Sequence, residues 1–323
     1  MLKYESEERI TMTEVLKHPF IKLCREHKYG KQGDYKNYHP ISIIDSGRFG
    51  IVFSASNSKD INTKEFAIKE MKGYNDMTRK EASCMRLCKH PNLVEYKDYF
   101  ETNFSLSETI QNNKLNNNLN NTINNNNKES KIYSYLVMEL CDESFRNYLR
   151  RKNKPLSNDE ILYFLGEISK GLYYLHYKKD LTHRDLKPEN ILLKNRENDV
   201  PQVKIADYGL SRCINDLMNS RVGTELYKAP EIIRLEQYND QCDLYSIGVM
   251  LYEMATFSFP FTNDPIIFEN EMRNQTKLKV PDYFNLDKDL VHLLEHLITH
   301  FVDERLTWLE FFKHPYVVKA MKK

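Results

Sequence analysis

Apolar residues gather in short, strand-like runs in the first half of the chain. These runs cover residues 41–54, 64–70 and 132–140, and they are rich in the β-branched and aromatic side chains that favour strands. Gly47 and Gly50 interrupt the first run and predict a turn between two strands. The pattern therefore predicts a small β-sheet in this half of the chain.

Helical spacing takes over in the second half of the chain. Ser157 and Glu160 have the spacing of a capping box, which predicts a helix start. Apolar residues then recur every three or four positions, as on one face of a helix: Ile161, Leu165, Ile168, Leu172 and Leu175. Further helices are expected at 240–256 and 287–300. A small sheet lobe followed by a larger helical lobe predicts an α+β fold.

Two polar segments interrupt this pattern. Residues 103–130 are dominated by asparagine and cannot bury enough apolar surface to offset the entropy lost on ordering. We expect them to form a disordered surface insertion, although such a tract can also act as an interaction site. Residues 24–36 are polar with two glycines and are expected to be a linker.

The two ends of the chain resemble each other. Residues 1–20 align without gaps with residues 297–316, and the matching pairs are Arg9 with Arg305, Thr11 with Thr307, Glu14 with Glu310, and His18-Pro19 with His314-Pro315. Each copy carries a T-x-x-E capping box and ends where His-Pro is expected to stop a helix. A unit that occurs only twice does not indicate a solenoid. It predicts that residues 1–23 are the closing piece of a second domain.

Composition narrows the possible functions. The 323 residues leave room for two units or one two-lobed enzyme, and 47 Lys and Arg balance 46 Asp and Glu. This balance argues against a nucleic-acid-binding protein, which needs a basic excess. No apolar run approaches the ~20 residues of a membrane helix. Six scattered cysteines lack C-x-x-C spacing, so we expect a cytoplasmic protein, with access to the nucleus left open.

The glycine turn is the first candidate for chemistry. Two glycines let the backbone approach a phosphate closely and aim amide groups at it. A glycine turn between strands is also an ordinary hairpin. Asp45 stands where a G-x-G-x-x-G motif would carry its first glycine, so the motif is incomplete.

The second candidate is Lys69, in a strand, with Glu81 twelve positions later in a helix-like stretch. A strand lysine can hold the α and β phosphates of a nucleotide when a carboxylate fixes its position. The alternative is an edge lysine beside an unrelated surface glutamate.

The third candidate is long and specific. It comprises His183-Arg184-Asp185-Leu186-Lys187-Pro188-Glu189-Asn190, then Asp207-Tyr208-Gly209, then Ala229-Pro230-Glu231. Phosphoryl transfer requires a carboxylate beside the attacking hydroxyl, a cation near the γ-phosphate and oxygen ligands for Mg²⁺. Asp185, Lys187, Asn190 and Asp207 supply that set.

With these motifs in order, residues 37–318 resemble the catalytic domain of eukaryotic protein kinases. The motif carries a lysine, Lys187, two residues after Asp185, and in this it resembles the serine/threonine branch of the family. The resemblance implies a small lobe at 37–140 that holds the insertion, and a large lobe at 141–318. Residues 1–23 are similar to the end of another kinase domain. The chain would then come from a tandem-kinase protein or from a truncated gene. The alternative is that these residues form a free-standing helix that packs on the surface.

The resemblance assigns roles to the candidate residues. Asp185 would accept or orient the substrate hydroxyl proton, Lys187 would steady the phosphoryl group, and Asn190 and Asp207 would hold Mg²⁺. Lys69, paired with Glu81, would bind the phosphates of ATP. The nucleotide site would also include Ile44, Gly47, Gly50, Val52, Ala67, Met138, Glu139, Cys141 and Leu192.

Structural and regulatory roles follow from the same resemblance. Glu231 would pair with Arg305, and Asp243 would anchor the catalytic loop from below. Phosphorylation of Ser220, by an upstream kinase or by autophosphorylation, would dock against Arg184 and order the activation segment. An ordinary loop serine is the alternative.

The resemblance implies an ATP- and Mg²⁺-dependent enzyme that phosphorylates proteins. A pseudokinase or scaffold is the alternative, because Asp45 and the short spacing from Lys69 to Glu81 depart from the usual pattern. A small-molecule kinase is disfavoured, because the segment through Ala229-Pro230-Glu231 is the part that docks peptides. Glu143 and Glu189 stand where acidic residues could favour basic groups upstream of the target hydroxyl.

Overall fold

The computed structural model describes residues 35–47, 50–57, 64–72, 76–108, 110, 132–195, 200–208, 212–213, 225–261 and 278–323. These residues fall into two compact units. The small unit comprises the described residues up to Lys89 together with 94–141, and the large unit comprises 90–93 together with the described residues from Asp142 onward.

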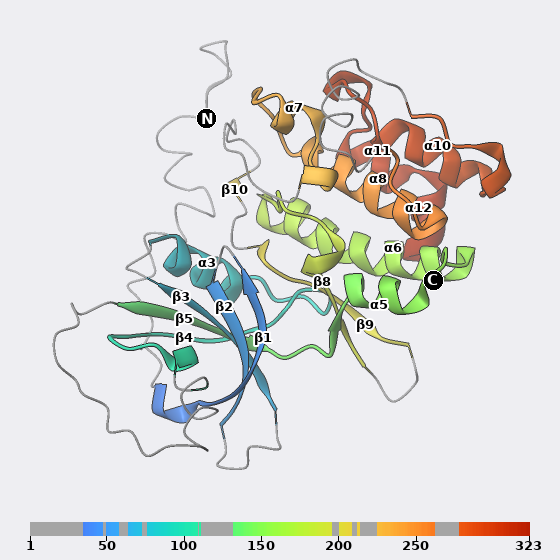
Figure 1. The fold of residues 1–323 in the computed structure, drawn as a ribbon. Coiled ribbons are helices and arrows are strands. Elements are labelled where there is room, and N and C mark those ends of the chain that lie inside the picture. The colour runs from blue at the N-terminus through green and yellow to red at the C-terminus, as the bar shows by residue number, and fades with distance from the viewer. Residues whose placement is uncertain are drawn as a thin grey trace, which may run out of the picture. The chain divides into compact units, whose positions relative to one another are not determined.

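The small unit is built on one five-stranded sheet, in which every pairing is antiparallel (Figure 1). The strand order is β1-β2-β3-β5-β4. The strands are β1 (His39–Gly47), β2 (Gly50–Ser56), β3 (Phe66–Lys72), β4 (Tyr96–Thr102) and β5 (Tyr133–Glu139). The small unit also contains the α-helix α3 (Asp76–Leu87), the short 3-10 helix η2 (Tyr35–Asn37) and a helical turn at residues 106–108. All three predicted strand regions are confirmed.

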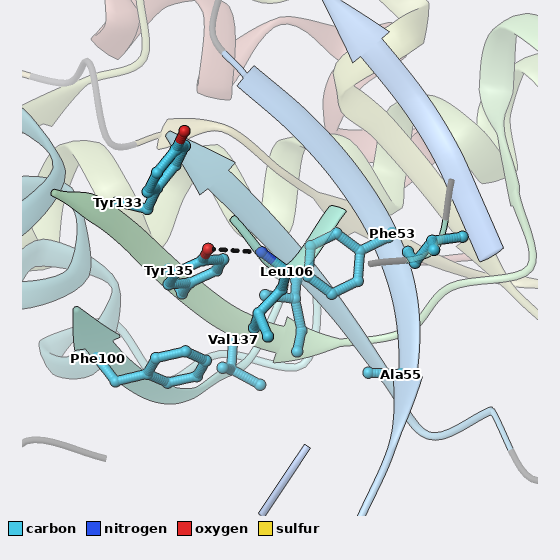
Figure 2. Close-up of a cluster of buried hydrophobic side chains, with 9 residues drawn as sticks. Phe53, Ala55, Phe100, Leu106, Tyr133, Tyr135 and Val137 are labelled. Carbon is cyan, nitrogen blue, oxygen red and sulfur yellow. Dashed lines mark hydrogen bonds between the residues drawn. The ribbon is translucent and has the colours of Figure 1, made fainter. Parts of the chain in front are cut away.

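Side chains alternate between the two faces of this sheet, because successive strand residues point to opposite sides. One face gathers an apolar cluster, shown in Figure 2. Its fully buried members are Phe53, Ala55, Ile68, Phe100, Tyr135 and Val137. On β3, Lys69 alternates with Ile68 and so belongs to the opposite face.

The predicted start of the disordered insertion is wrong. Residues 104–108 and 110 are folded: Leu106–Glu108 are helical, and Leu106 and Ile110 belong to the apolar cluster. Their burial depends on hydrogen bonds to strands far away in sequence, which the local composition does not reveal. The remainder of the asparagine-rich tract lies outside the described residues, apart from its first residue, Asn103. Tyr35, placed in the linker by sequence, packs edge-on against Phe104.

The large unit is mainly helical (Figure 1). Its helices are α5 (Phe145–Lys152), α6 (Asn158–Tyr173), η3 (Tyr174–Lys178), η4 (Pro188–Asn190), η6 (Glu225–Tyr227), α7 (Pro230–Ile233), α8 (Gln241–Thr256), η7 (Asp282–Phe284), α10 (Lys288–Leu297), η8 (Val302–Glu304), α11 (Trp308–Lys313) and α12 (Pro315–Met321). Its short strands are β6 (Glu143–Ser144), β7 (Leu181–Thr182), β8 (Ile191–Lys194), β9 (Gln202–Ile205) and β10 (Arg212–Cys213). The fold is therefore α+β, as predicted. None of the described helices is long and apolar enough to cross a membrane.

The predicted helix starts are confirmed at atomic detail. Ser157 caps α6 and Thr307 caps α11, each with the reciprocal hydrogen bonds of a capping box. The predicted stop at His314-Pro315 is only half right. α11 ends there, but His314 then caps α12, and Pro315 begins it, because proline fits the first turn of a helix.

The predicted division into two lobes assigns four residues to the wrong lobe. His90–Leu93 group with the large unit although the sequence places them in the small one. Asn92 explains this, because its side-chain amide donates to Glu167 Oε2 and to the carbonyl oxygen of Val203. Its carbonyl oxygen also accepts from the amide of Ile205.

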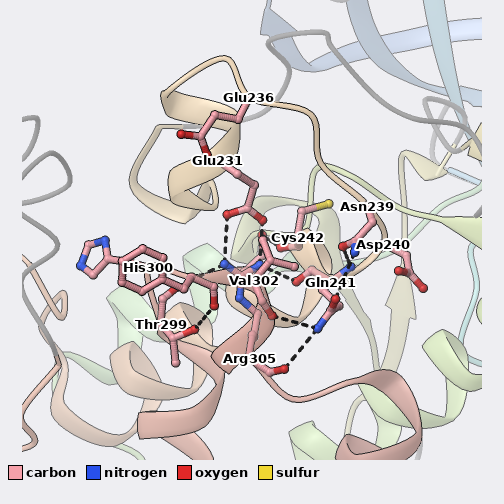
Figure 3. A network of polar contacts seen from close by, with 12 residues as sticks. Glu231, Glu236, Asn239, Asp240, Gln241, Cys242, Thr299, His300, Val302 and Arg305 are labelled. Atoms are coloured by element: carbon pink, nitrogen blue, oxygen red, sulfur yellow. Dashed lines mark hydrogen bonds and ion pairs between the residues drawn. The ribbon is translucent and has the colours of Figure 1, made fainter. Parts of the chain in front are cut away.

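The buried ion pair of Glu231 and Arg305 ties α7 to the C-terminal helices (Figure 3). The two guanidinium nitrogens lie 2.8 and 3.0 Å from the two carboxylate oxygens. Arg305 also donates to the carbonyl oxygens of Gln241 and Thr299. The two charges are therefore paired and hydrogen-bonded, as their burial requires, although Nε of Arg305 has no hydrogen-bond partner among the described residues.

We expect Arg305→Leu to lower the free energy of unfolding by about 3–5 kcal/mol, because it leaves a buried, unpaired carboxylate. Urea denaturation measures this. Lys319→Ala is the control: its ion pair with Asp287 spans 3.7 Å and its side chain is 55% exposed. It should change stability by less than ~0.5 kcal/mol. Equal stability of both variants would contradict this account of the pair.

Candidate active site

Lys69 and Glu81 form a buried ion pair within the small unit. Lys69 lies on β3, which is hydrogen-bonded to strands on both sides, so its backbone is held firmly. Its Nζ donates to Glu81 Oε1 over 3.0 Å, and the side chains are 9% and 10% exposed. α3 begins at Asp76, five positions before Glu81, so the short spacing still lets the helix carry the carboxylate to the lysine.

The glycine turn joins β1 to β2, with Gly47 directly opposite Gly50. Gly50 has a φ of 127°, and a Cβ there would collide with the carbonyl oxygen of Glu70. Only glycine therefore fits this position. Asp45 is exposed, and its Oδ1 accepts from the amide of Ser46 over 2.8 Å.

Three of the predicted catalytic and metal residues meet in the large unit. Lys187 Nζ lies 2.8 Å from Asp185 Oδ2, and Asn190 Nδ2 donates to the same oxygen over 3.0 Å. Asn190 Nδ2 also lies 2.8 Å from the carbonyl oxygen of Asp185. Both side-chain contacts use Oδ2, so in the described part of the chain Oδ1 of Asp185 remains available to a substrate hydroxyl.

Asp243, on α8, holds residues 183–190, the predicted catalytic loop. Its two carboxylate oxygens accept from the amides of His183 and Arg184 over 2.6 and 2.7 Å. Arg184 adopts the left-handed conformation, with a φ of 74°, which a non-glycine residue rarely does. Burial raises the pKa of the Asp243 carboxyl, while His183 and the two amides favour its charged form.

The β8–β9 pair brings Asp207 next to this loop. Ile191 pairs with Ile205, so Asn190, just before β8, and Asp207, just after β9, come to the same end of the hairpin. The amide of Ala206 donates to the carbonyl oxygen of Asn190 over 2.8 Å. Asp207 has a φ of 55°.

These side chains offer oxygen ligands of the kind that Mg²⁺ prefers. Mg²⁺ is usually held by one or two carboxylates together with substrate phosphates, rather than by a complete protein cage. Within the described residues, no group of three His, Cys, Asp or Glu side chains is close enough to hold a metal alone. The Asn190 amide oxygen and the Asp207 carboxylate fit a site that the phosphates complete.

The residues predicted for the adenine pocket lie on both units. Ala67 and Met138 are buried and directly opposite each other on β3 and β5. The amide of Glu139 donates to the carbonyl oxygen of Glu95, so this amide is not offered to a nucleotide. Val52 and Cys141 are half-buried and Ile44 is exposed in the small unit, whereas Leu192 lies on β8 of the large unit.

The predicted regulatory residues are only partly described. Ser220 lies outside the described residues. Arg184, its predicted partner, is buried, donates to the hydroxyl of Tyr238 over 2.5 Å and lies over its ring. Sequence reasoning did not single out Tyr238, because no motif marks it.

The two acidic residues predicted to favour basic substrates already have arginine partners. Glu143 accepts from Arg151 and Glu189 accepts from Arg146, both on α5, over 2.6 and 2.8 Å. Arg146 also contacts Glu253 and Tyr227. A basic substrate side chain would have to compete with these arginines.

A family comparison agrees with this geometry. Residues 38–317 match the family model of the protein kinase domain. Because the match covers most of the chain, the chain belongs to the protein kinase family.

Relatives in other organisms carry related domains. Serine/threonine-protein kinase atg1 of Dictyostelium discoideum is 32% identical over 196 residues, which cover 59% of this chain and 28% of the relative. Serine/threonine-protein kinase ATG1c of Arabidopsis thaliana is 29% identical over 282 residues, 85% of this chain and 34% of the relative. Serine/threonine-protein kinase SRK2B of Arabidopsis thaliana is 27% identical over 293 residues, 88% of this chain and 72% of the relative. The chain thus spans about a third of the length of the first two relatives.

We expect Asp243→Ala to destabilise the protein by about 2–5 kcal/mol, because two buried amides lose their acceptor. Chemical denaturation followed by fluorescence measures the loss. Asp303→Ala, which removes an exposed carboxylate from η8, should leave the midpoint nearly unchanged. An Asp243→Ala protein as stable as the Asp303→Ala control would show that the loop does not depend on this anchor.

Proposed function

We propose that the protein is an ATP-dependent serine/threonine kinase that transfers the γ-phosphoryl group of ATP to hydroxyl groups of protein substrates. The arrangement around Asp185 is the observation that carries the proposal. Lys187 and Asn190 hold one oxygen of its carboxylate, and the other is left to accept a hydrogen bond from a substrate hydroxyl. A second observation is the Lys69–Glu81 pair, which keeps a charged lysine ready for the phosphates of ATP.

Each side chain would then have a defined task. Asp185 orients the attacking hydroxyl and accepts its proton, and Lys187, next to it, balances the charge of the moving phosphoryl group. Asn190 and Asp207 would hold Mg²⁺, which neutralises negative charge on the phosphates when bound. Lys69 holds the α and β phosphates, and the backbone of the glycine turn, which carries no side chain at Gly47 or Gly50, would lie against them.

Serine and threonine are the proposed acceptors. Lys187, two residues after Asp185, supports this choice, and the relatives named above are serine/threonine-protein kinases. An upstream kinase or autophosphorylation at Ser220 remains our proposal for activation. A pseudokinase is the alternative, with Asp45 as the observation in its favour.

We also propose that residues 1–23 are the end of another kinase domain. The second copy of the repeat supports this, because its buried side chains have matching types in the first copy. Trp308, Phe311 and Tyr316 are buried and correspond to Met12, Val15 and Phe20. Arg305, which pairs with Glu231, corresponds to Arg9. Kinase motifs encoded directly upstream in the gene would support the proposal, and an unrelated upstream sequence would contradict it.

We expect Asp185→Asn to reduce phosphoryl transfer by about 10²–10⁴-fold, because the amide no longer accepts the hydroxyl proton. Incubation with Mg-ATP and a peptide library measures this, and melting temperature checks that the variant is folded. Equal and negligible transfer by the wild type and the variant, with ATP still bound, would favour the pseudokinase.

Asp45 should weaken ATP binding through its charge and through the stiffness it adds to the turn. We expect Asp45→Gly to tighten ATP binding, as measured by calorimetry. Asp45→Asn separates the two causes, because it removes the charge and keeps a side chain that can accept from Ser46. If neither variant changes the affinity, Asp45 does not act on the nucleotide.

A further inference from the structure

A folded segment covers the apolar face of the small-unit sheet. We call this segment the cap; it comprises residues 104–108 and Ile110. Leu106 and Ile110 join the apolar cluster, and Figure 2 shows the amide of Leu106 facing the hydroxyl of Tyr135. Phe104 adds an edge-on contact with Tyr35 at 5.1 Å between ring centres. The cap is thus held at both ends by apolar side chains.

A buried carboxylate holds the middle of the cap. Glu70, on β3, is 5% exposed. Its Oε1 accepts from the hydroxyls of Ser105 and Ser107 over 2.8 and 2.7 Å. Its Oε2 accepts from the amide of Ser107 and the hydroxyl of Tyr135, both over 2.9 Å.

All of these partners are neutral. Burial, and then the charge of Glu70, raise the pKa of Tyr135, so its hydroxyl keeps its proton. The two serine hydroxyls lie 3.1 Å apart on the same carboxylate oxygen and are 6% and 2% exposed as residues. The hydrogen bonds at this site therefore compensate one negative charge, that of Glu70. Among the described residues, no cation lies against Glu70 to compensate a second.

We propose that Ser105 and Ser107 are phosphorylation sites, and that a phosphate on either one detaches the cap from Glu70. The modifying enzyme is a protein serine/threonine kinase, either a second copy of this protein or another kinase. In the reaction, a serine Oγ bonds to the γ-phosphorus of ATP and the bond from that phosphorus to the β–γ bridging oxygen breaks. ADP leaves, and the serine proton passes to the base of the modifying kinase.

Charge explains why the cap would detach. A phosphoserine that lacks an arginine partner and faces a carboxylate disrupts its surroundings by repulsion and by the cost of desolvation. The serines become accessible when the cap opens, and a short segment held by three apolar side chains and a few hydrogen bonds opens more readily than the sheet. A phosphate added in the open state would prevent its return.

Detachment of the cap would change the position of β3, which carries Lys69, the residue proposed to bind the phosphates of ATP. Glu70 directly follows Lys69, and its carbonyl oxygen lies against Gly50 of the glycine turn. Without the cap, the carboxylate of Glu70 must move toward water, and β3 moves with it. ATP binding should therefore weaken. This consequence rests on the proposed function, whereas the detachment itself does not.

Matched variants at Ser107 separate charge from size. Asp and Asn have nearly the same shape, so Ser107→Asp and Ser107→Asn differ mainly in charge. We expect Ser107→Asp to melt at least about 4 °C below Ser107→Asn. We also expect amide hydrogen exchange in the cap and in β3 to rise, and ATP affinity to fall roughly tenfold. Asn103→Asp adds a charge just outside the cap and should behave like the wild type.

The Glu70→Gln substitution tests whether the charge of Glu70 causes the difference between the two Ser107 variants. In this background the difference in melting temperature between Ser107→Asp and Ser107→Asn should fall to half or less, because the carboxamide removes the repulsion and leaves only the cost of desolvating the aspartate. A difference that is undiminished in Glu70→Gln, or that is absent in the wild-type background, overturns the proposal. Melting and exchange do not require catalysis, so a failure of the proposed function is recognised separately.

Phosphosite mapping tests the modification directly. Protein incubated with Mg-ATP, and Asp185→Asn protein expressed in eukaryotic cells with phosphatases inhibited, are both mapped by mass spectrometry. Phosphate at Ser105 or Ser107 in the first sample indicates autophosphorylation, and in the second it indicates another kinase. Unmodified serines in fully covered peptides from both samples overturn the proposal.

Discussion

The carboxylate of Asp243 is the contact on which the large-unit site depends. It lies in the buried helix α8 and accepts from two successive amides of the catalytic loop. Burying a charge is unfavourable unless hydrogen bonds compensate for lost water, and these two amides provide that compensation. In return the loop is held with Arg184 in a left-handed conformation, which sets the direction in which Asp185 leaves the backbone. Lys187 and Asn190 then fix the carboxylate of Asp185.

The same rule governs the other buried charges. Lys69 has Glu81, and Arg305 has Glu231 together with two carbonyl oxygens. Glu70 differs, because its partners are neutral hydroxyls and an amide. A buried ion pair resists small changes in its surroundings, since breaking it leaves a charge uncompensated. A carboxylate held by hydroxyls depends on those hydroxyls staying uncharged, which makes the cap the part of the small unit most sensitive to modification.

Much of the fold and of the site could be predicted where the signal is local. The capping boxes at Ser157 and Thr307 start helices because their hydrogen bonds lie within four residues. The glycine pair marks the turn from β1 to β2, and the motif from His183 to Asn190 is continuous in sequence. The α+β class follows from the order of these elements.

The errors arise where structure depends on distant partners. The cap lies in an asparagine-rich tract whose composition predicts disorder, yet Glu70, more than thirty positions earlier, holds it through hydrogen bonds. His90–Leu93 join the large unit because Asn92 bonds to Glu167 and Val203. Tyr238 lies beneath Arg184 without any motif to mark it. No periodicity or composition encodes such pairings, because they require the folded chain.

Magnesium-dependent nucleotide binding tests the central claim most directly. The claim is that Asn190 and Asp207 form half of a metal site that the phosphates of ATP complete. Calorimetry with a non-hydrolysable ATP analogue should show binding at least about tenfold tighter with Mg²⁺ than without it in the wild type, a difference of about 1.4 kcal/mol. Asp207→Asn should abolish that difference while the protein stays folded. Equal affinity with and without Mg²⁺ in the wild type would contradict the account.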